Sequence, residues 1–126
     1  MPERSILLVE DNEDSAAAMA ELLRLHGYVV KVAASVHDAL NLAEEADVLV
    51  SDIAMPGEDG YDLIHRVREL PADAGGLTPA VALTAYVRIE DQHAAIAAGY
   101  QRHIKKPVVV AELIAVVVEL AALKVD

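Results

Sequence analysis

Hydrophobic positions along the chain form short continuous runs that alternate with longer segments of helical spacing. The first run, residues 6–9, is unbroken and is stopped by acidic residues, which is typical of a strand buried on both faces. Four later segments also predict strands, one of them from its β-branched residues, and the last is less apolar, which favours a position at the sheet edge. These four predicted strands are residues 28–33, 47–51, 80–84 and 101–106.

Segments between the runs predict helices, because apolar residues recur there at three- and four-residue spacing. The first helix shows this spacing on one face at Ala16, Met19, Ala20 and Leu23. Gly27 follows it as a helix stop, and Ser35 is suited to cap the second helix. Further helices are predicted near residues 63–70, 88–98 and 109–123, with a loop over residues 71–79.

Strand–helix units that follow one another predict an α/β domain, in which a mostly parallel sheet carries helices on both faces. We expect one domain over residues 1–126, because the length suits a single domain and no linker or repeat interrupts it. In such doubly wound sheets, ligands bind at the carboxyl ends of the strands. The residues that end the first, third, fourth and fifth strands are therefore the candidates for chemistry.

Composition narrows the possible classes of protein. The formal net charge of −11 argues against direct nucleic-acid binding, because phosphate backbones attract Lys- and Arg-rich surfaces. The absence of cysteine excludes disulfides and thiol catalysis. No apolar stretch approaches the ~20 residues that span a bilayer, and the first apolar run is too short for a signal peptide. We expect a soluble, cytoplasmic protein without membrane insertion.

Polar side chains end four of the predicted strands, and they are Glu10 with Asp11, Asp52, Thr84 and Lys106. Three nearby carboxylates repel one another and require a cation, and Mg²⁺ prefers such oxygen ligands. Carboxylates are known acceptors of phosphoryl groups. A metal ion, a lysine and a threonine hydroxyl are suited to hold the oxygens of such a group.

Each of these residues also has a simpler structural interpretation. Acidic residues after a strand are often solvated or cap a helix, as Asn12 or Asp14 would here. Thr84 alone fits a helix cap, and Lys106 alone fits a solvated surface lysine. For each residue alone, the structural interpretation is the better one. Polar residues at the ends of four strands of one sheet together favour a functional site.

The motifs at these strand ends closely resemble those of the response-regulator receiver domain, in the right order over nearly the whole chain. They are Leu8-Val9-Glu10-Asp11-Asn12, Ser51-Asp52-Ile53-Ala54-Met55-Pro56-Gly57-Glu58-Asp59-Gly60, Leu83-Thr84-Ala85 and Lys105-Lys106-Pro107. The D-x-x-M-P-x-x-D-G string is highly specific, and the other elements are strong in combination. The resemblance implies a flavodoxin-like (βα)5 fold with strand order 2-1-3-4-5.

By this resemblance Asp52 is the phosphoacceptor of a two-component phosphorelay. Glu10, Asp11 and Asp52 would bind Mg²⁺, and the backbone carbonyl of Ala54 would add a further ligand.

Thr84 would hydrogen-bond the phosphoryl group once it arrives, and Lys106 would pair with the same group. The peptide bond between Lys106 and Pro107 would be cis. Lys105 competes for this role, but neighbouring residues of a strand point to opposite faces. The family's lysine directly precedes the proline, which favours Lys106.

Three positions bear on signalling and phosphate lifetime. The family usually has Tyr or Phe three residues before its lysine, and this side chain moves with Thr84 as part of the switch; here the position holds His103. Because imidazole changes charge near neutral pH, we hypothesise a weaker or pH-sensitive switch, with a solvated edge histidine as an equal alternative. Ala54 and Tyr86 occupy the positions that tune phosphate lifetime, and they predict a long-lived acyl phosphate.

The last predicted helix is apolar around most of its circumference, with one polar stripe at Glu112 and Glu119. A helix of this kind indicates a second buried contact beyond the core. In the family, the surface from the fourth helix to the last is the usual dimer or output interface, so we expect a homodimer or partner face over residues 88–123. An ordinary valine-rich core helix is the alternative.

The leading functional hypothesis is a switch that takes phosphate from a histidine kinase or histidine phosphotransfer protein and then alters binding to a downstream protein. It would not be an enzyme beyond catalysing its own phosphorylation and dephosphorylation. In the family, exposed residues of the first helix select the kinase, and here they include Ser15, Ala18 and Leu22. We expect either a stand-alone regulator or the receiver of a hybrid sensor kinase.

Two other classes compete with this hypothesis. A degenerate receiver would act as a phosphorylation-independent binding module, but the intact acidic, Thr and Lys positions argue against it. A hydrolase with an aspartyl intermediate would need a second carboxylate two residues after its nucleophile, and Ala54 stands there.

Overall fold

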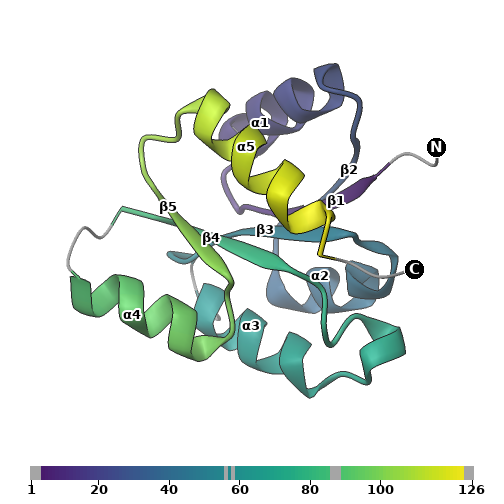
Figure 1. Cartoon of the computed structure of the whole chain (residues 1–126), viewed down its shortest axis with the longest axis vertical. Helices are drawn as coiled ribbons and strands as arrows, with labels where there is room; N and C mark the ends of the chain where they lie inside the picture. The colour runs from purple at the N-terminus through teal and green to yellow at the C-terminus, as the bar shows by residue number, and fades with distance from the viewer. Residues whose placement is uncertain (1–3, 56, 58, 86–88, 124–126) are drawn as a thin grey trace.

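Five parallel strands form the centre of the molecule, in the order β2-β1-β3-β4-β5 (Figure 1). They are β1 (Ser5–Val9), β2 (Val29–Ala33), β3 (Val48–Asp52), β4 (Ala80–Thr84) and β5 (Arg102–Lys105). This computed structural model describes residues 4–55, 57, 59–85 and 89–123. The strand order confirms the flavodoxin-like α/β fold that the sequence predicts.

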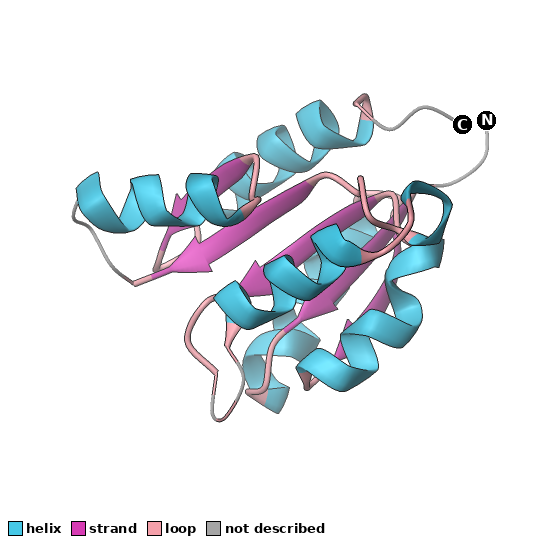
Figure 2. Cartoon of the chain, turned by 90° about the horizontal axis from the view of Figure 1, so that it is seen from below, coloured by secondary structure: helices cyan, strands magenta, loops and turns pink. Residues whose placement is uncertain are grey.

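Helices cover both faces of the sheet and give the molecule three layers (Figure 2). They are α1 (Glu13–Leu25), α2 (Val36–Leu42), α3 (Gly60–Glu69), α4 (Ile89–Ala98) and α5 (Val110–Ala121), with short 3-10 helices at Ala43–Glu45 and Ala72–Ala74. In Figure 1, α1 and α5 lie on one side of the sheet, and α2, α3 and α4 lie on the other. Within the described ranges, none of these helices is long and apolar enough to cross a bilayer.

Two hydrophobic cores fill the spaces between the layers. Leu8 of β1 belongs to the core beneath α1 and α5, whereas its neighbours Leu7 and Val9 belong to the core beneath α2, α3 and α4. This division follows from the alternation of side chains along a strand. The central strands β3 and β4 are buried at every residue, which explains their unbroken apolar runs.

The open edges of the sheet are formed by β2 and β5. The edge position of β5 confirms the prediction from its weaker apolar character. Lys31 on β2 and both Arg102 and Lys105 on β5 have exposed side chains, so each edge strand carries basic residues at its surface.

Side-chain caps begin α1 and α2. Asn12 accepts a hydrogen bond from the Ser15 amide at 2.9 Å and caps α1, which selects Asn12 over Asp14. Ser35 accepts one from the Asp38 amide at 3.2 Å and caps α2, as the sequence predicts. Each cap satisfies an amide that the first helical turn leaves without an intrahelical partner.

Several boundaries differ from the predicted ones by a few residues. The third strand was expected over residues 47–51 but includes Asp52, because Asp52 pairs with Leu83 and the Ile53 amide donates to the Leu83 carbonyl at 3.0 Å. The ladder therefore continues one residue further. Met19, expected on the core face of α1, is only half-buried. Arg88, the expected start of the fourth helix, lies outside the described residues.

A buried and an exposed leucine of α1 provide a test of the packing beneath this helix. Leu23 is fully buried, whereas Leu25 is 76% exposed. We expect Leu23→Ala to lower the free energy of unfolding by about 2–5 kcal/mol, since it removes buried methyl groups and leaves a cavity. Leu25→Ala should change it by less than about 0.5 kcal/mol. Urea unfolding followed by circular dichroism measures both, and equal losses would contradict this packing.

Candidate functional site

Three carboxylates meet where β1 and β3 end. One side-chain oxygen each from Glu10, Asp11 and Asp52 lies within 4.8 Å of the others. The strands are neighbours and Val9 pairs with Ser51, so the residues that follow these two lie side by side. Glu10 and Asp52 are only 6% and 4% exposed, whereas Asp11 is exposed. We call these three residues the acidic cluster.

Lys106 supplies a cation to this cluster. Its Nζ donates a hydrogen bond to Asp52 Oδ2 at 2.8 Å. Its backbone amide donates to the Thr84 carbonyl at 2.7 Å, which holds Lys106 beside the end of β4. The Lys106–Pro107 peptide bond is cis. Lys105, the competing lysine, is exposed and pairs with Thr84 in the strand register.

Thr84 is the last residue of β4, the strand between β3 and β5. Its side chain is buried, at 5% exposure. Since Asp52 pairs with Leu83, Thr84 stands one residue beyond the level of Asp52 on the neighbouring strand. The structure thus brings the predicted acceptor, lysine and threonine positions together at the carboxyl ends of the strands.

The charges of this site are unbalanced. Burial raises the pKa of Glu10 to about 7, and the neighbouring Asp52 carboxylate adds to the rise while Lys106 opposes it. Glu10 Oε2 is buried and, within the described part of the chain, has no hydrogen-bond partner. An oxygen in this state, beside two further carboxylates, suits a hard divalent cation that prefers oxygen ligands.

The segment after β3 folds back over Asp52. The Ala54 amide donates to Asp52 Oδ1 at 3.2 Å and so orients the carboxylate. Ala54 is exposed, and the part of its carbonyl in metal binding stays a prediction. Tyr86, the second predicted lifetime position, lies outside the described residues.

His103 lies on the edge strand β5 and is half-buried. It borders a shallow hollow between α4 and α5, together with Ile96 and Val116. This partial exposure is compatible both with a part in switching and with the alternative of a solvated edge histidine, and its part in switching stays a prediction. The other histidines were expected at the surface and are exposed; they are His26, His37, His65 and His93.

The start of α3 contributes a feature that sequence reasoning did not assign. Asp59 caps the helix by accepting hydrogen bonds from the Tyr61 and Asp62 amides at 2.9 and 3.1 Å. Asp62 Oδ2 in turn accepts from the Asp59 amide at 2.9 Å, which completes a capping box. The spacing D-x-x-D was the available signal. The box fixes where α3 begins, at the end of the connection that follows β3.

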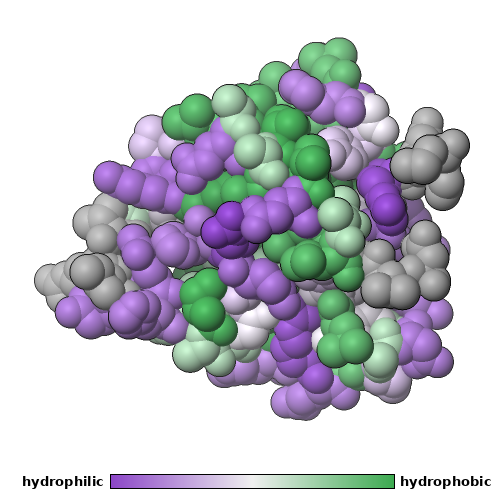
Figure 3. All heavy atoms as spheres, viewed as in Figure 1, coloured by the Kyte–Doolittle hydropathy of each residue, from purple (hydrophilic) through white to green (hydrophobic). Residues whose placement is uncertain are grey.

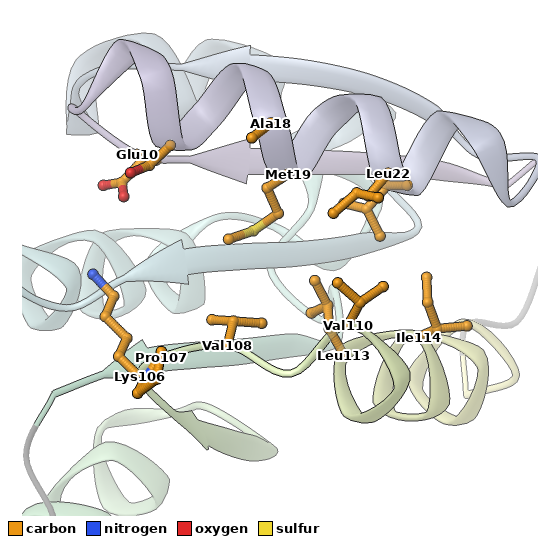
Figure 4. Close-up of a pocket in the computed structure, with 12 residues that line it drawn as sticks. Glu10, Ala18, Met19, Leu22, Lys106, Pro107, Val108, Val110, Leu113 and Ile114 are labelled. Carbon is orange, nitrogen blue, oxygen red and sulfur yellow. The ribbon is translucent and has the colours of Figure 1, made fainter.

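An apolar groove between α1 and α5 opens beside the acidic cluster (Figure 4). Figure 4 shows Glu10 and Lys106 at one end of the groove and Leu22 and Ile114 toward the other. Its lining residues are Glu10, Ser15, Ala18, Met19, Leu22, Leu23, Lys106, Pro107, Val108, Val110, Leu113 and Ile114. Helical periodicity could not reveal it, because spacing defines a helix face but not how completely a neighbour covers that face. This groove explains why Met19 is only half-buried.

Known proteins share this sequence and architecture. The family model described as the response regulator receiver domain matches residues 6–118. A protein of Leptolyngbya boryana, named only as an uncharacterized 14.6 kDa protein in the sodA1 3' region, is 44% identical over 119 residues, which are 93% of this chain and 89% of that protein. The transcriptional regulatory protein PrrA of Mycobacterium tuberculosis is 35% identical over 112 residues. That match covers 87% of this chain but only 46% of PrrA.

Among solved structures, the receiver domain of the sensor histidine kinase PA1611 from Pseudomonas aeruginosa PAO1 has a TM-score of 0.84 and 30% identity. The match covers 96% of this chain and 99% of that one, which was crystallised with a magnesium ion coordinated in its active-site cleft. On the family match and these identities, the chain belongs to the response regulator receiver domain family.

Proposed function

We propose that this chain is a phosphorylation switch of a two-component phosphorelay, in which Asp52 accepts a phosphoryl group from a phosphohistidine. The observation that carries the proposal is the contact of Lys106 Nζ with Asp52 Oδ2 at 2.8 Å, within the acidic cluster in which Glu10 and Asp52 are buried. Residues 1–126 would form one receiver domain, cytoplasmic and free of membrane insertion. It would act on no substrate other than itself.

In the transfer step, a carboxylate oxygen of Asp52 attacks phosphorus as the bond from phosphorus to the histidine nitrogen breaks. The nitrogen keeps the electron pair, and an acyl phosphate forms on Asp52. Lys106 already donates to Asp52 Oδ2 and would pair with the incoming oxygens. Thr84, at the end of the adjacent strand, would donate its hydroxyl to one of them.

The acidic cluster would hold Mg²⁺ through Glu10, Asp11 and Asp52, with the Ala54 carbonyl as a further ligand. The buried Glu10 Oε2 without a described hydrogen-bond partner and the short separations of the three carboxylates fit such an ion. When bound, it would supply positive charge to the phosphoryl oxygens. The methyl side chain of Ala54 has no polar group to orient an attacking water, which supports a long-lived acyl phosphate.

The groove between α1 and α5 would receive the phosphohistidine donor, a histidine kinase or histidine phosphotransfer protein. Ser15, Ala18 and Leu22 line it, and Glu10 and Lys106 stand at its end. A partner helix that lies along this apolar groove would thus bring its phosphohistidine to Asp52. Apolar anchors beside a charged end suit a partner that is both bound and oriented.

The surface of α4, β5 and α5 would carry the output, either to a downstream protein or to a second copy of the chain. Figure 3 shows apolar atoms over α5, and Val118 of this helix is 55% exposed. His103 lies within this surface and would modulate its response to phosphorylation. The negative net charge of −11 favours a protein rather than a nucleic acid as the direct target.

Phosphorylation of Asp52 is tested with acetyl phosphate and Mg²⁺, followed by intact mass measurement. We expect one phosphoryl adduct on the wild type and none on Asp52→Ala. Asp73→Ala should keep the adduct, because Asp73 is an exposed carboxylate of the 3-10 helix that follows α3. A wild type without an adduct would favour the phosphorylation-independent binding module, and repeated turnover of acetyl phosphate would favour a hydrolase.

Stability of the metal-free protein should depend on pH through Glu10. The folded protein holds this proton up to a pKa of about 7, whereas the unfolded chain releases it near 4.5. The stabilisation by the neutral carboxyl is complete below pH 4.5 and is lost as pH rises through 7. Relative to the wild type, Glu10→Gln should therefore gain about 1–3 kcal/mol of unfolding free energy between these limits.

Urea unfolding in the presence of a chelator measures this difference. Glu21→Gln changes an exposed carboxylate of α1 and should show no comparable gain. Addition of Mg²⁺ should reverse the advantage of Glu10→Gln at high pH, because the ion favours the charged carboxylate. A difference between Glu10→Gln and wild type that does not vary with pH would contradict this account of the site.

Two adjacent alanines of α1 test the groove. Ala18 lines it, whereas Ala17 is exposed on the same helix and does not. Ala18→Arg should slow transfer from a phosphorylated histidine phosphotransfer protein by about tenfold or more, since a large charged side chain blocks an apolar contact. Phosphorylation by acetyl phosphate should be unchanged. Ala17→Arg is the control. The donor is chosen from a panel of purified histidine phosphotransfer proteins as the one that phosphorylates the wild type fastest. Equal slowing by both variants would argue against the groove as the donor site.

A further inference from the structure

Tyr100 lies where α4 passes into β5 and is buried, at 1% exposure. Its hydroxyl donates a hydrogen bond to the backbone carbonyl of Gly60, 2.7 Å away and 40 residues earlier in the chain. Burial raises the pKa of the Tyr100 phenol above its ordinary value, so the hydroxyl keeps its proton and remains a donor. The contact joins the start of β5 to the first residue of α3.

Gly60 in turn lies directly against the backbone that carries Asp52. Its amide donates to the Ile53 carbonyl at 2.9 Å. A Cβ atom added to Gly60 would stand 2.7 Å from both the Asp52 carbonyl oxygen and the Ile53 Cα, closer than such atoms approach. The start of α3 therefore packs closely on the backbone at the end of β3, so a shift of Gly60 would press on the backbone of Asp52 and Ile53.

The other end of α3 holds the same junction between α4 and β5. Arg68 Nε and Nη2 donate to the Gly99 carbonyl at 3.1 and 2.7 Å. Arg68 also binds the carbonyls of Gly76 and Thr78 at 3.1 and 2.7 Å. Because Gly99 directly precedes Tyr100, the tyrosine is anchored at its backbone while its hydroxyl reaches the beginning of the helix.

We propose that Tyr100 is a positioning residue for the phosphoacceptor. Its hydroxyl would fix the end of the connection between β3 and α3, which begins directly after Asp52 and carries Ala54. The hydrogen bond from the Gly60 amide to the Ile53 carbonyl joins the two ends of this connection. The Tyr100 hydroxyl binds the carbonyl of the same Gly60. The connection carries the Ala54 amide that orients Asp52 Oδ1 at 3.2 Å. The inference rests on the proposed phosphorylation of Asp52 and adds to it a residue remote from the acidic cluster.

The conservative variant Tyr100→Phe removes only the hydroxyl. We expect the Mg²⁺ dissociation constant to rise about three- to tenfold, and the phosphorylation rate at saturating Mg²⁺ and acetyl phosphate to fall by a similar factor, the effect of one hydrogen bond of ordinary strength. Tyr28→Phe is the matched control, because Tyr28 is a partly buried tyrosine that packs on the core beneath α1 and α5. Both measurements are made at a temperature at which circular dichroism shows each variant to be fully folded.

Amide hydrogen exchange of the metal-free protein provides a second measurement that does not depend on phosphorylation. The Gly60 amide should exchange faster in Tyr100→Phe and at the wild-type rate in Tyr28→Phe. A role in packing alone would lower the thermal midpoint of Tyr100→Phe but leave its Mg²⁺ affinity, phosphorylation rate and Gly60 exchange unchanged, and that result would overturn the proposal. A wild type that takes no phosphoryl group would remove the proposed function, while faster Gly60 exchange would still support positioning by Tyr100.

Discussion

Neighbouring parallel strands have their carboxyl ends on the same side of a sheet, so the side chains at these ends lie close together in one small volume. In this chain the shared volume contains three carboxylates and one ammonium group. Two unit charges about 4 Å apart repel each other by about 4 kcal/mol at the effective dielectric of a protein surface. Three pairs of about this repulsion are comparable in size to the roughly 5–15 kcal/mol by which an ordinary domain is stable. The edge is therefore tolerable only with a counter-cation or with a proton held on one carboxyl group.

Both remedies are visible in the arrangement of the site. Lys106 reaches Asp52 from the far side of β4. Burial and the neighbouring Asp52 raise the pKa of Glu10, which favours a proton within the acidic cluster below about pH 7. A divalent ion would replace that proton and restore a short-range balance of charge. On the proposed function, the same imbalance would attract a metal ion, and that ion together with Lys106 would then offset the negative charge of a phosphoryl group.

Much of this organisation was predictable from local sequence patterns. Buried parallel strands are continuous in apolar residues, so β1, β3 and β4 were found to within a residue, and the polar residues that end them indicated the edge where chemistry would lie. The missing parts depend on contacts between distant segments. Local spacing contains no signal that the Tyr100 hydroxyl meets Gly60, and the apolar period of α1 does not show that Met19 faces a groove. The choice of Asn12 over Asp14 as cap likewise required backbone geometry.

The two edge strands have a consequence for how copies of this chain can meet. An exposed strand edge offers unpaired backbone groups to any other strand, and basic side chains are one means of preventing that pairing. The chain has 10 Lys and Arg residues, and three of them, Lys31, Arg102 and Lys105, stand exposed on β2 and β5. Lys31 and Arg102 each pair with a carboxylate of the same chain, Glu45 and Glu119. Extension of the sheet from one molecule into the next would have to displace these charged side chains from the strand edges. Edge-to-edge pairing of two sheets would therefore be disfavoured, which leaves the helical faces as the surface for the proposed contact between two copies.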